Sequence, residues 1–158
     1  MNMIPIDQYN NIISVMPVLC VDLLLRNSKG EFLFVRRANE PKKDQWWPVG
    51  GRVIKGETLE QAAVRKIQEE TSLSIHNLHP VGYFETVNDV HPFNLENSYH
   101  AVSVVFIADI DDDQTIRLDP QSKGWKYSLF LPREFLIHPF VTGKNGNFLK
   151  GDLSPDLG

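Results

Sequence analysis

Apolar residues gather in short, dense runs along most of the chain, a pattern typical of buried β-strands. Val18 to Arg26 is rich in valine and leucine, and Glu31 to Arg37 follows after a polar segment that contains Gly30. Two such runs around a short glycine-containing connection predict a β-hairpin. Further runs predict strands over Trp46 to Val49, Val81 to Val87, Tyr99 to Ile110 and Trp125 to Leu131.

One segment between these runs has helical periodicity instead. Thr58 is a good N-cap, and Gln61, three residues later, completes a capping box. The pattern predicts a helix from Thr58 to about Ser72, whose small alanines allow it to lie close against a sheet. Its apolar stripe comprises Leu59, Ala62, Ala63 and Ile67.

A second, short helix is predicted over Pro132 to Ile137, because proline suits the first position of a helix. Strands on both sides of one central helix, with this late helix, predict an α/β fold in which a mixed β-sheet lies between helical layers. A chain of 158 residues is expected to form a single domain, 1–158. Its last part, about residues 141–158, is rich in glycine, asparagine and aspartate and is expected to be a loose tail.

Composition and charge limit the kinds of binding partner that the chain is expected to have. The formal net charge of −4 argues against a nonspecific nucleic-acid binder, so no nucleic-acid partner is expected. Cys20 is the only cysteine, which excludes an intramolecular disulfide and suits a small core residue. The chain has neither a signal-peptide pattern nor an apolar run near the ~20 residues that span a bilayer. We therefore expect no membrane partner and a cytoplasmic location.

The segment from Gly50 to Leu73 carries the candidate chemistry. Glu69 and Glu70 project about 100° apart around the predicted helix, so one can face the glycine pair while the other braces it. Hard cations such as Mg²⁺ prefer oxygen ligands, and a flexible Gly50-Gly51 loop could aim a backbone carbonyl at such an ion. The alternative is a solvated helix with ordinary surface charges.

This segment resembles the Nudix box, written G-x5-E-x7-R-E-U-x-E-E-x-G-U with U apolar. Lys66 stands where the pattern has glutamate, and Ser72 where it has glycine. The resemblance implies the Nudix α/β/α sandwich and an enzyme that cleaves a nucleoside diphosphate linked to another moiety, with a divalent metal. The matching residues are Gly51, Glu57, Arg65, Ile67, Glu69, Glu70 and Leu73.

The flanking residues look like the GDP-mannose mannosyl hydrolase branch of that family. Similar stretches are Val21-Asp22-Leu23, Asn27 to Glu31, Arg36-Arg37 and Trp47 to Val53. The resemblance implies a nucleotide-sugar substrate and one Mg²⁺, with Mn²⁺ as an acceptable substitute. It also implies three metal ligands, namely the carbonyl of Gly50, Glu70 and Gln121. Homodimers are common in that branch, so a homodimer is compatible with the resemblance.

The same resemblance suggests roles for the arginines in the predicted site. Arg36 and Arg37 point to opposite faces of a strand, so only one can enter the site. Arg37 is chosen with Arg52 as a diphosphate contact and leaving-group stabiliser, because guanidinium groups bind phosphate oxygens as a fork. Arg65 is a further substrate-site residue, expected to order the site through Glu57 or Glu69. The resemblance favours Asp22 as a substrate-site residue that contacts the sugar or an arginine in the pocket, with a structural ion pair as the alternative.

Lys66 departs from the general box pattern, although the branch tolerates loss of the glutamate there, and Ser122 and Ala101 depart from the branch itself. Lys66 could pair with Glu70 and repel a second Mg²⁺, or it could face solvent. Ser122 follows Gln121 where the branch has a histidine as general base, and His91 and His100 are spare candidates.

Three interpretations therefore remain. The first is a hydrolase that releases GDP and sugar, and the second is a pyrophosphatase that attacks phosphorus with Glu69 as base or second metal ligand. The third is a non-catalytic nucleotide-sugar binder.

Overall fold

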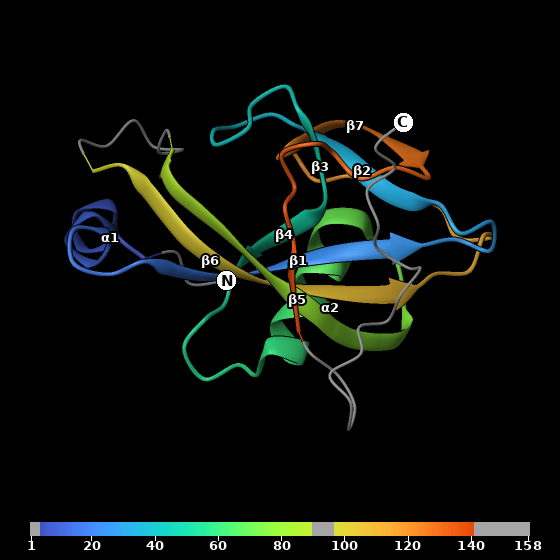
Figure 1. The fold of residues 1–158 in the computed structure, drawn as a ribbon, viewed down its shortest axis with the longest axis horizontal. Helices are drawn as coiled ribbons and strands as arrows, with labels where there is room; N and C mark the ends of the chain where they lie inside the picture. Colours follow the sequence, from blue (N-terminus) through green and yellow to red (C-terminus); the bar gives the residue numbers. More distant parts are fainter. Residues whose placement is uncertain (1–3, 90–96, 141–158) are drawn as a thin grey trace.

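Eight strands form one mixed β-sheet in the computed structural model, which describes residues 4–89 and 97–140 (Figure 1). The strands lie in the order β3-β2-β1-β6-β5-β8, with β4 also paired to β1 and β7 to β2. β1 and β6 are parallel, whereas the other pairs are antiparallel. The elements are α1 (Ile6–Ile13), β1 (Val18–Arg26), β2 (Phe32–Arg37), β3 (Trp46–Trp47), β4 (Val49–Arg52), α2 (Leu59–Thr71), β5 (His76–Asp89), β6 (Tyr99–Asp109), β7 (Ser122–Ser128) and β8 (His138–Pro139).

The predicted hairpin between β1 and β2 is confirmed, but the two strands pair with each other only near the turn. Arg26 pairs with Phe32 at its base, and Gly30 adopts a positive φ of 79° in the turn. Beyond that base the first half of β1 pairs with β4 instead, with Asp22 opposite Gly50. This switch of partner brings the glycine pair directly beside the middle of β1.

Two apolar cores lie on opposite faces of the sheet. Alternate residues of β1 serve each of them, because successive strand side chains point to opposite faces. One core packs α2 on the sheet through Val21, Leu23, Leu25, Ala62, Ala63 and Ile67. The other contains Leu24, Phe34, Trp47, Phe84, Val105 and Phe135. The helix that carries the candidate chemistry is thereby held against the centre of the sheet (Figure 1).

Two predictions about elements need correction, and one helix was not predicted. Residues 132–137 form a turn rather than a helix, with the N–H of Phe135 bonded to the carbonyl of Pro132 at 3.0 Å. Burial of Phe135 in the second core and pairing of β8 with β5 explain the difference. β7 begins and ends three residues before the predicted Trp125 to Leu131, because it pairs with β2 from Arg37 to Phe32. Helix α1 was not expected from the sequence.

Two further expectations concern the C-terminal tail and membrane-spanning helices. The predicted loose tail, residues 141–158, lies outside the described residues, so that prediction stays open. Among the described residues, neither α1 nor α2 has the length and apolar character of a membrane span.

Candidate active site

Helix α2 begins as the sequence predicts. The backbone N–H of Gln61 donates to the hydroxyl of Thr58 at 3.1 Å, and the side chain of Gln61 accepts from the N–H of Thr58 at 2.8 Å. Ala62, Ala63 and Ile67 are fully buried against the sheet. This fixes the rotation of the helix, so that Lys66 and Glu70 turn inward beside β4 and Glu69 stays at the margin.

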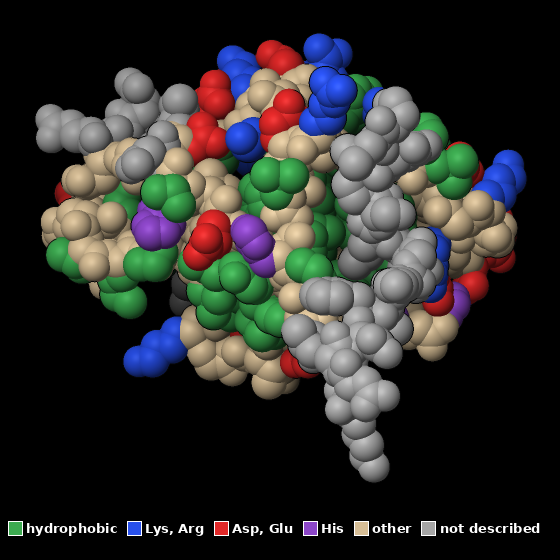
Figure 2. Space-filling view, in the orientation of Figure 1, with side chains coloured by type: hydrophobic (Ala, Val, Ile, Leu, Met, Phe, Trp, Pro, Cys, Tyr) green, Lys and Arg blue, Asp and Glu red, His purple; other side chains and the backbone are tan. Residues whose placement is uncertain are grey.

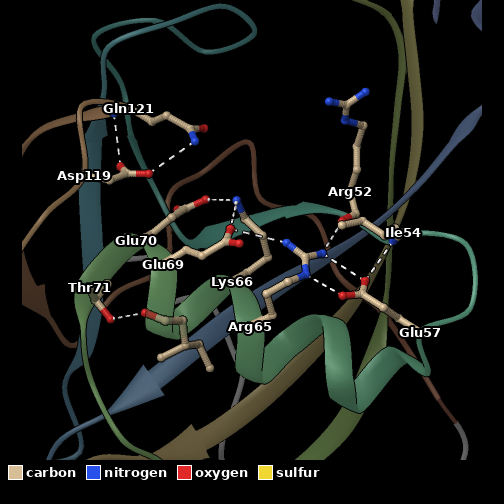
Figure 3. Close-up of polar contacts among 11 residues, drawn as sticks. Arg52, Ile54, Glu57, Arg65, Lys66, Glu69, Glu70, Thr71, Asp119 and Gln121 are labelled. Carbon is tan, nitrogen blue, oxygen red and sulfur yellow. Dashed lines mark hydrogen bonds and ion pairs between the residues drawn. The ribbon is translucent and has the colours of Figure 1, made fainter. Parts of the chain in front are cut away.

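Lys66 is buried in an ion pair, so its solvent-facing alternative is wrong. Its ammonium nitrogen lies 2.7 Å from Oε1 of Glu70 and 3.6 Å from Oε2 of Glu69 (Figure 3). Only 5% of Lys66 and 4% of Glu70 are exposed. Burial raises the pKa of Glu70, and the ammonium of Lys66 opposes that rise. The partner of the buried Oε1 of Glu70 is therefore the Lys66 ammonium.

The glycine pair lies in strand β4 rather than in a flexible loop, which corrects the sequence prediction. Neither Gly50 nor Gly51 has a positive φ. Space, rather than dihedral freedom, requires glycine at both positions. A Cβ at Gly50 would lie 2.3 Å from the carbonyl oxygen of Val21, and one at Gly51 would lie 2.5 Å from Cε of Lys66. The absence of a side chain at Gly51 makes the room that the Lys66 side chain occupies.

Arg65 contacts acidic residues both before helix α2 and in its last turn. Its guanidinium bonds to both oxygens of Glu57, to Oε2 of Glu69 at 3.3 Å and to the carbonyl of Arg52 at 3.0 Å (Figure 3). Glu57 in turn accepts the N–H of Ile54 at 2.8 Å. Hydrogen bonding from Arg65 lowers the pKa of Glu57. These contacts match the expected ordering role, and substrate contact by Arg65 stays a prediction.

Arg37 is the member of the arginine pair that faces the interior. Its Nε donates to the carbonyl of Pro41 at 2.7 Å, and its charge acts on both Asp22 and Glu70. Arg36 is instead half-exposed beside Asp44, at 4.0 Å. Figure 2 shows charged side chains of both signs over β2 and β3, at the top of that view.

Asp22 is buried on the face of β1 opposite to α2. It is 8% exposed and hydrogen-bonds with Ser103 of β6. Burial raises the pKa of its carboxyl from 3.8 to about 6, although Ser103 and Arg37 both favour the charged form. Arg37 therefore acts as a nearby counter-charge, and the predicted substrate contact by Asp22 stays a prediction.

Arg52 lies apart from the carboxylates of α2. Its guanidinium stacks over the ring of Tyr9 in α1 at 4.6 Å, and its side chain points away from Arg65 and Glu69 (Figure 3). Because Arg52 pairs with Cys20 and Gly50 pairs with Asp22, Arg52 projects on the same face as Asp22. The two predicted diphosphate arginines thus lie on different strands, Arg37 at the end of β2 and Arg52 at the end of β4.

Gln121 lies at the C-terminal end of α2, immediately before β7. Its carbonyl accepts the N–H of Ala38 at 2.9 Å, and its side-chain amide donates to Asp119 at 3.2 Å. The N–H of Asp119 donates to the carbonyl of Glu70 at 3.3 Å. The predicted ligands Glu70 and Gln121 are therefore linked through Asp119, which sequence reasoning missed although the Asp-Pro-Gln turn signal was present.

The metal donors are mixed in type. No group of three or more histidine, cysteine, aspartate or glutamate side chains suited to a metal occurs in the described part of the chain. A carboxylate, an amide oxygen and a backbone carbonyl nevertheless form an all-oxygen set suited to a hard cation.

The candidate bases lie elsewhere. Ser122 begins β7 opposite Arg37 and donates its N–H to the carbonyl of Asp119 at 3.3 Å. His100 is exposed on β6, and His91 lies outside the described residues. Cys20 is buried, as expected, with its sulfur 3.7 Å from the hydroxyl of Tyr99. Burial raises the pKa of that thiol to about 11, which makes Cys20 a poor nucleophile.

Comparisons with known proteins agree with this geometry. A model of the NUDIX domain matches residues 16–150. The low-salt glycan biosynthesis protein Agl8 of Haloferax volcanii is 33% identical over 138 residues, covering 87% of this chain and 86% of that protein. The ADP-ribose pyrophosphatase of Methanocaldococcus jannaschii is 34% identical over 136 residues, covering 82% and 76%.

A solved structure has the same fold. It is a MutT/nudix family protein from Enterococcus faecalis, with a TM-score of 0.58 at 20% identity over 80% of this chain and 56% of that chain. The chain belongs to the Nudix family. The predicted α/β/α sandwich with a mixed sheet and the predicted class of enzyme, a Nudix hydrolase, are confirmed.

Proposed function

We propose that this Nudix hydrolase uses one Mg²⁺ to cleave a nucleotide sugar into a nucleoside diphosphate and a sugar. The observation that carries the proposal is the Lys66 ammonium, fixed 2.7 Å from Glu70 and 3.6 Å from Glu69. The ammonium engages Oε1 of Glu70, so we propose that one ion binds through the other oxygen of that carboxylate, while the ammonium repels a second metal ion. Two metals can stabilise both oxygens of an in-line attack on phosphorus. A single ion suits a departing diphosphate instead.

The proposed ligands are the carbonyl of Gly50, the carboxylate of Glu70 and the amide oxygen of Gln121. Mg²⁺ accepts oxygen ligands and completes its shell with water and phosphate, and Mn²⁺ accepts the same donor types. When bound, the ion supplies positive charge for the departing diphosphate.

The side chains of the chain itself account for the other roles. Arg37, whose Nε is held by the carbonyl of Pro41, presents the rest of its guanidinium fork to diphosphate oxygens. Arg52 is the second proposed diphosphate contact, on the same face as Asp22. Asp22 is proposed to accept a hydrogen bond from a sugar hydroxyl, and Arg65 to hold the loop before α2 in place.

The bond changes are those of a glycosyl hydrolysis. Water attacks the anomeric carbon, the bond from that carbon to the diphosphate oxygen breaks, and its electron pair leaves with the diphosphate. A serine hydroxyl is a weak base, so Ser122 is a poor acceptor for the proton of the water. We therefore expect slow turnover that rises with pH, as hydroxide takes the place of a general base.

A pyrophosphatase is the second candidate. It is favoured by the side chain of Glu69, which is 34% exposed and could act as a base or second metal ligand beside Lys66 at 3.6 Å and Arg65 at 3.3 Å. A relative named as an ADP-ribose pyrophosphatase, at 34% identity, also favours it. Attack on phosphorus would release a nucleoside monophosphate and a sugar phosphate.

Hydrolysis of GDP-mannose in ¹⁸O-labelled water with Mg²⁺ tests the proposal. We expect the label in mannose and none in GDP, read by mass spectrometry of both products. The variant Glu70→Gln is the control and should lose nearly all turnover, because an amide is a neutral, weaker ligand. Label in GMP or mannose 1-phosphate would establish the pyrophosphatase, and saturable binding without any product would establish a non-catalytic binder.

A further inference from the structure

The segment that leads into β7 is docked on the end of α2. The N–H of Arg117 donates to the carbonyl of Thr71 at 2.9 Å, and the N–H of Asp119 donates to the carbonyl of Glu70 at 3.3 Å. The last carbonyls of a helix have no partner within the helix, so these two bonds satisfy groups that would otherwise need water. The segment therefore keeps a fixed position relative to Glu70.

The carboxylate of Asp119 holds Gln121 at two points. Oδ1 accepts the backbone N–H of Gln121 at 3.1 Å, and Oδ2 accepts its side-chain Nε2 at 3.2 Å (Figure 3). An ionised carboxylate only accepts hydrogen bonds, and in a glutamine amide only the nitrogen donates. Asp119 can therefore bind only the NH₂ end of that amide.

This contact settles which end of the amide is available to an ion. With Nε2 held by Asp119, the carbonyl Oε1 is the free end of Gln121, and an amide oxygen is a ligand for hard cations whereas an amide NH₂ is not. Sequence-adjacent Pro120 restricts the backbone between the two residues. The carboxylate oxygens of Asp119 are themselves both engaged with Gln121.

We propose that Asp119 is a positioning residue of the metal site, which orients the Gln121 amide so that its oxygen faces the ion shared with Glu70. This inference rests on the proposed function, in which Gln121 is a metal ligand. It assigns Asp119 an effect that passes entirely through Gln121. Partners of this kind typically change metal affinity by about 10- to 100-fold when they are removed.

A double-mutant cycle on Mn²⁺ affinity tests the proposal without substrate, by electron paramagnetic resonance of free Mn²⁺. In Asp119→Asn the new amide NH₂ can oppose that of Gln121 and turn it over, so we expect affinity to fall about tenfold. Gln121→Ala should lower affinity as well. The double variant should be no weaker than Gln121→Ala alone, because Asp119 has then lost the residue through which it acts.

A second comparison separates orientation from a general loss of structure. Adding Gln121→Glu to Asp119→Asn should restore affinity, because a carboxylate presents oxygen at either end. Asp112→Asn is the matched control, since Asp112 also accepts a backbone N–H, that of Ser28 at 3.0 Å, in another exposed turn. Its Mn²⁺ affinity should equal that of the wild type.

The outcomes are distinct. Additive losses in the double variant would mean that Asp119 ligates the ion or acts by its charge alone, and would overturn the proposal. Unchanged affinity in Asp119→Asn would overturn it as well, while leaving the proposed metal-dependent function intact. A wild-type protein that binds no Mn²⁺ would instead overturn the proposed function together with this inference.

Discussion

Lys66 has the most unusual environment of the residues in the candidate site. A long side chain that ends in a charge normally keeps its ammonium in water, yet this one is 5% exposed beside Gly51. The sequence offered pairing with Glu70 as one of two alternatives, because positions four apart share a helix face. The sequence could not indicate that the Lys66 side chain is buried, because its burial depends on the packing of β4 against α2 and on the glycine at position 51.

The carboxyl of Asp22 gives a prediction for stability against pH. Burial raises its pKa from 3.8 to about 6, so the folded protein binds this proton more tightly than the unfolded chain does. That contribution to stability is complete below about pH 4 and is lost as pH rises through 6. Asp22→Asn should therefore be more stable than the wild type at pH 8, by at most about 3 kcal/mol, with little difference at pH 4.

Urea unfolding at the two pH values, with chelator present, measures this difference. Asp109→Asn is a control of opposite sign, because hydrogen bonds from Arg26 and Asn77 lower the pKa of Asp109. That variant should lose stability at pH 8 and approach the wild type as the pH falls. A gain for Asp22→Asn that is equal at pH 4 and pH 8 would contradict the inferred titration of Asp22.

The sequence predicts helix α2 but not helix α1. The capping box and the apolar stripe of α2 are local signals, and the structure reproduces both. In α1, Ile6, Tyr9 and Ile13 do have helical spacing, but Pro5 provides no side-chain cap and Tyr9 alone is buried. The false helix at 132–137 has the converse cause, since a proline signal was overridden by burial of Phe135 and by pairing of β8.

The pairing of β4 with β1 gives a prediction for this element. A Cβ at Gly50 would collide with backbone, namely the carbonyl of Val21 at 2.3 Å, whereas one at Gly51 would collide with the side chain of Lys66 at 2.5 Å. Backbone in a sheet cannot move aside, but a lysine side chain can. Gly50→Ala should therefore destabilise by more than the ~1–3 kcal/mol typical of overpacking, and Gly51→Ala by an amount within that range.

Thermal and urea unfolding of the two variants, side by side, measure the ranking. In Gly51→Ala the displaced Lys66 should also loosen its pair with Glu70, whereas Gly50→Ala leaves Lys66 untouched. Equal losses, or a larger loss for Gly51→Ala, would show that β4 yields more readily than Lys66 and would contradict the packing argument.

The whole molecule depends on pairings between distant segments. A mixed α/β sheet could be predicted because strand runs flank one strong helix, and the Nudix box predicted the family. Two pairings have no local signal in the sequence, because they join residues far apart in the chain. These are the parallel pairing of β1 with β6 and the change of partner along β1 from β2 to β4. The link from Asp119 to Gln121 was missed although its turn signal is local, and the docking of Asp119 on Glu70 has no local signal. A homodimer and a cytoplasmic location stay predictions.

The response of the fold to metal removal is expected to be small. Two apolar cores hold the sheet and α2 together, and Lys66 already compensates the buried carboxylate of Glu70. Removal of the metal by EDTA should therefore leave the far-ultraviolet circular dichroism unchanged. Added Mg²⁺ should stabilise only by mass action, about 2.7 kcal/mol at a hundredfold excess over Kd.

Removing the Lys66 charge should make stability depend on metal. Lys66→Met leaves Glu70 buried without its counter-ion, a loss of about 3–5 kcal/mol for such pairs. Saturating Mg²⁺ should recover part of this loss, because the ion then supplies the missing positive charge, so its stabilising effect should exceed that on the wild type. Lys55→Met, an exposed lysine before α2, is the matched control and should respond as the wild type does. Unfolding of the wild type by EDTA, or equal effects of Mg²⁺ on all three proteins, would show that Lys66 does not stand in for a metal charge.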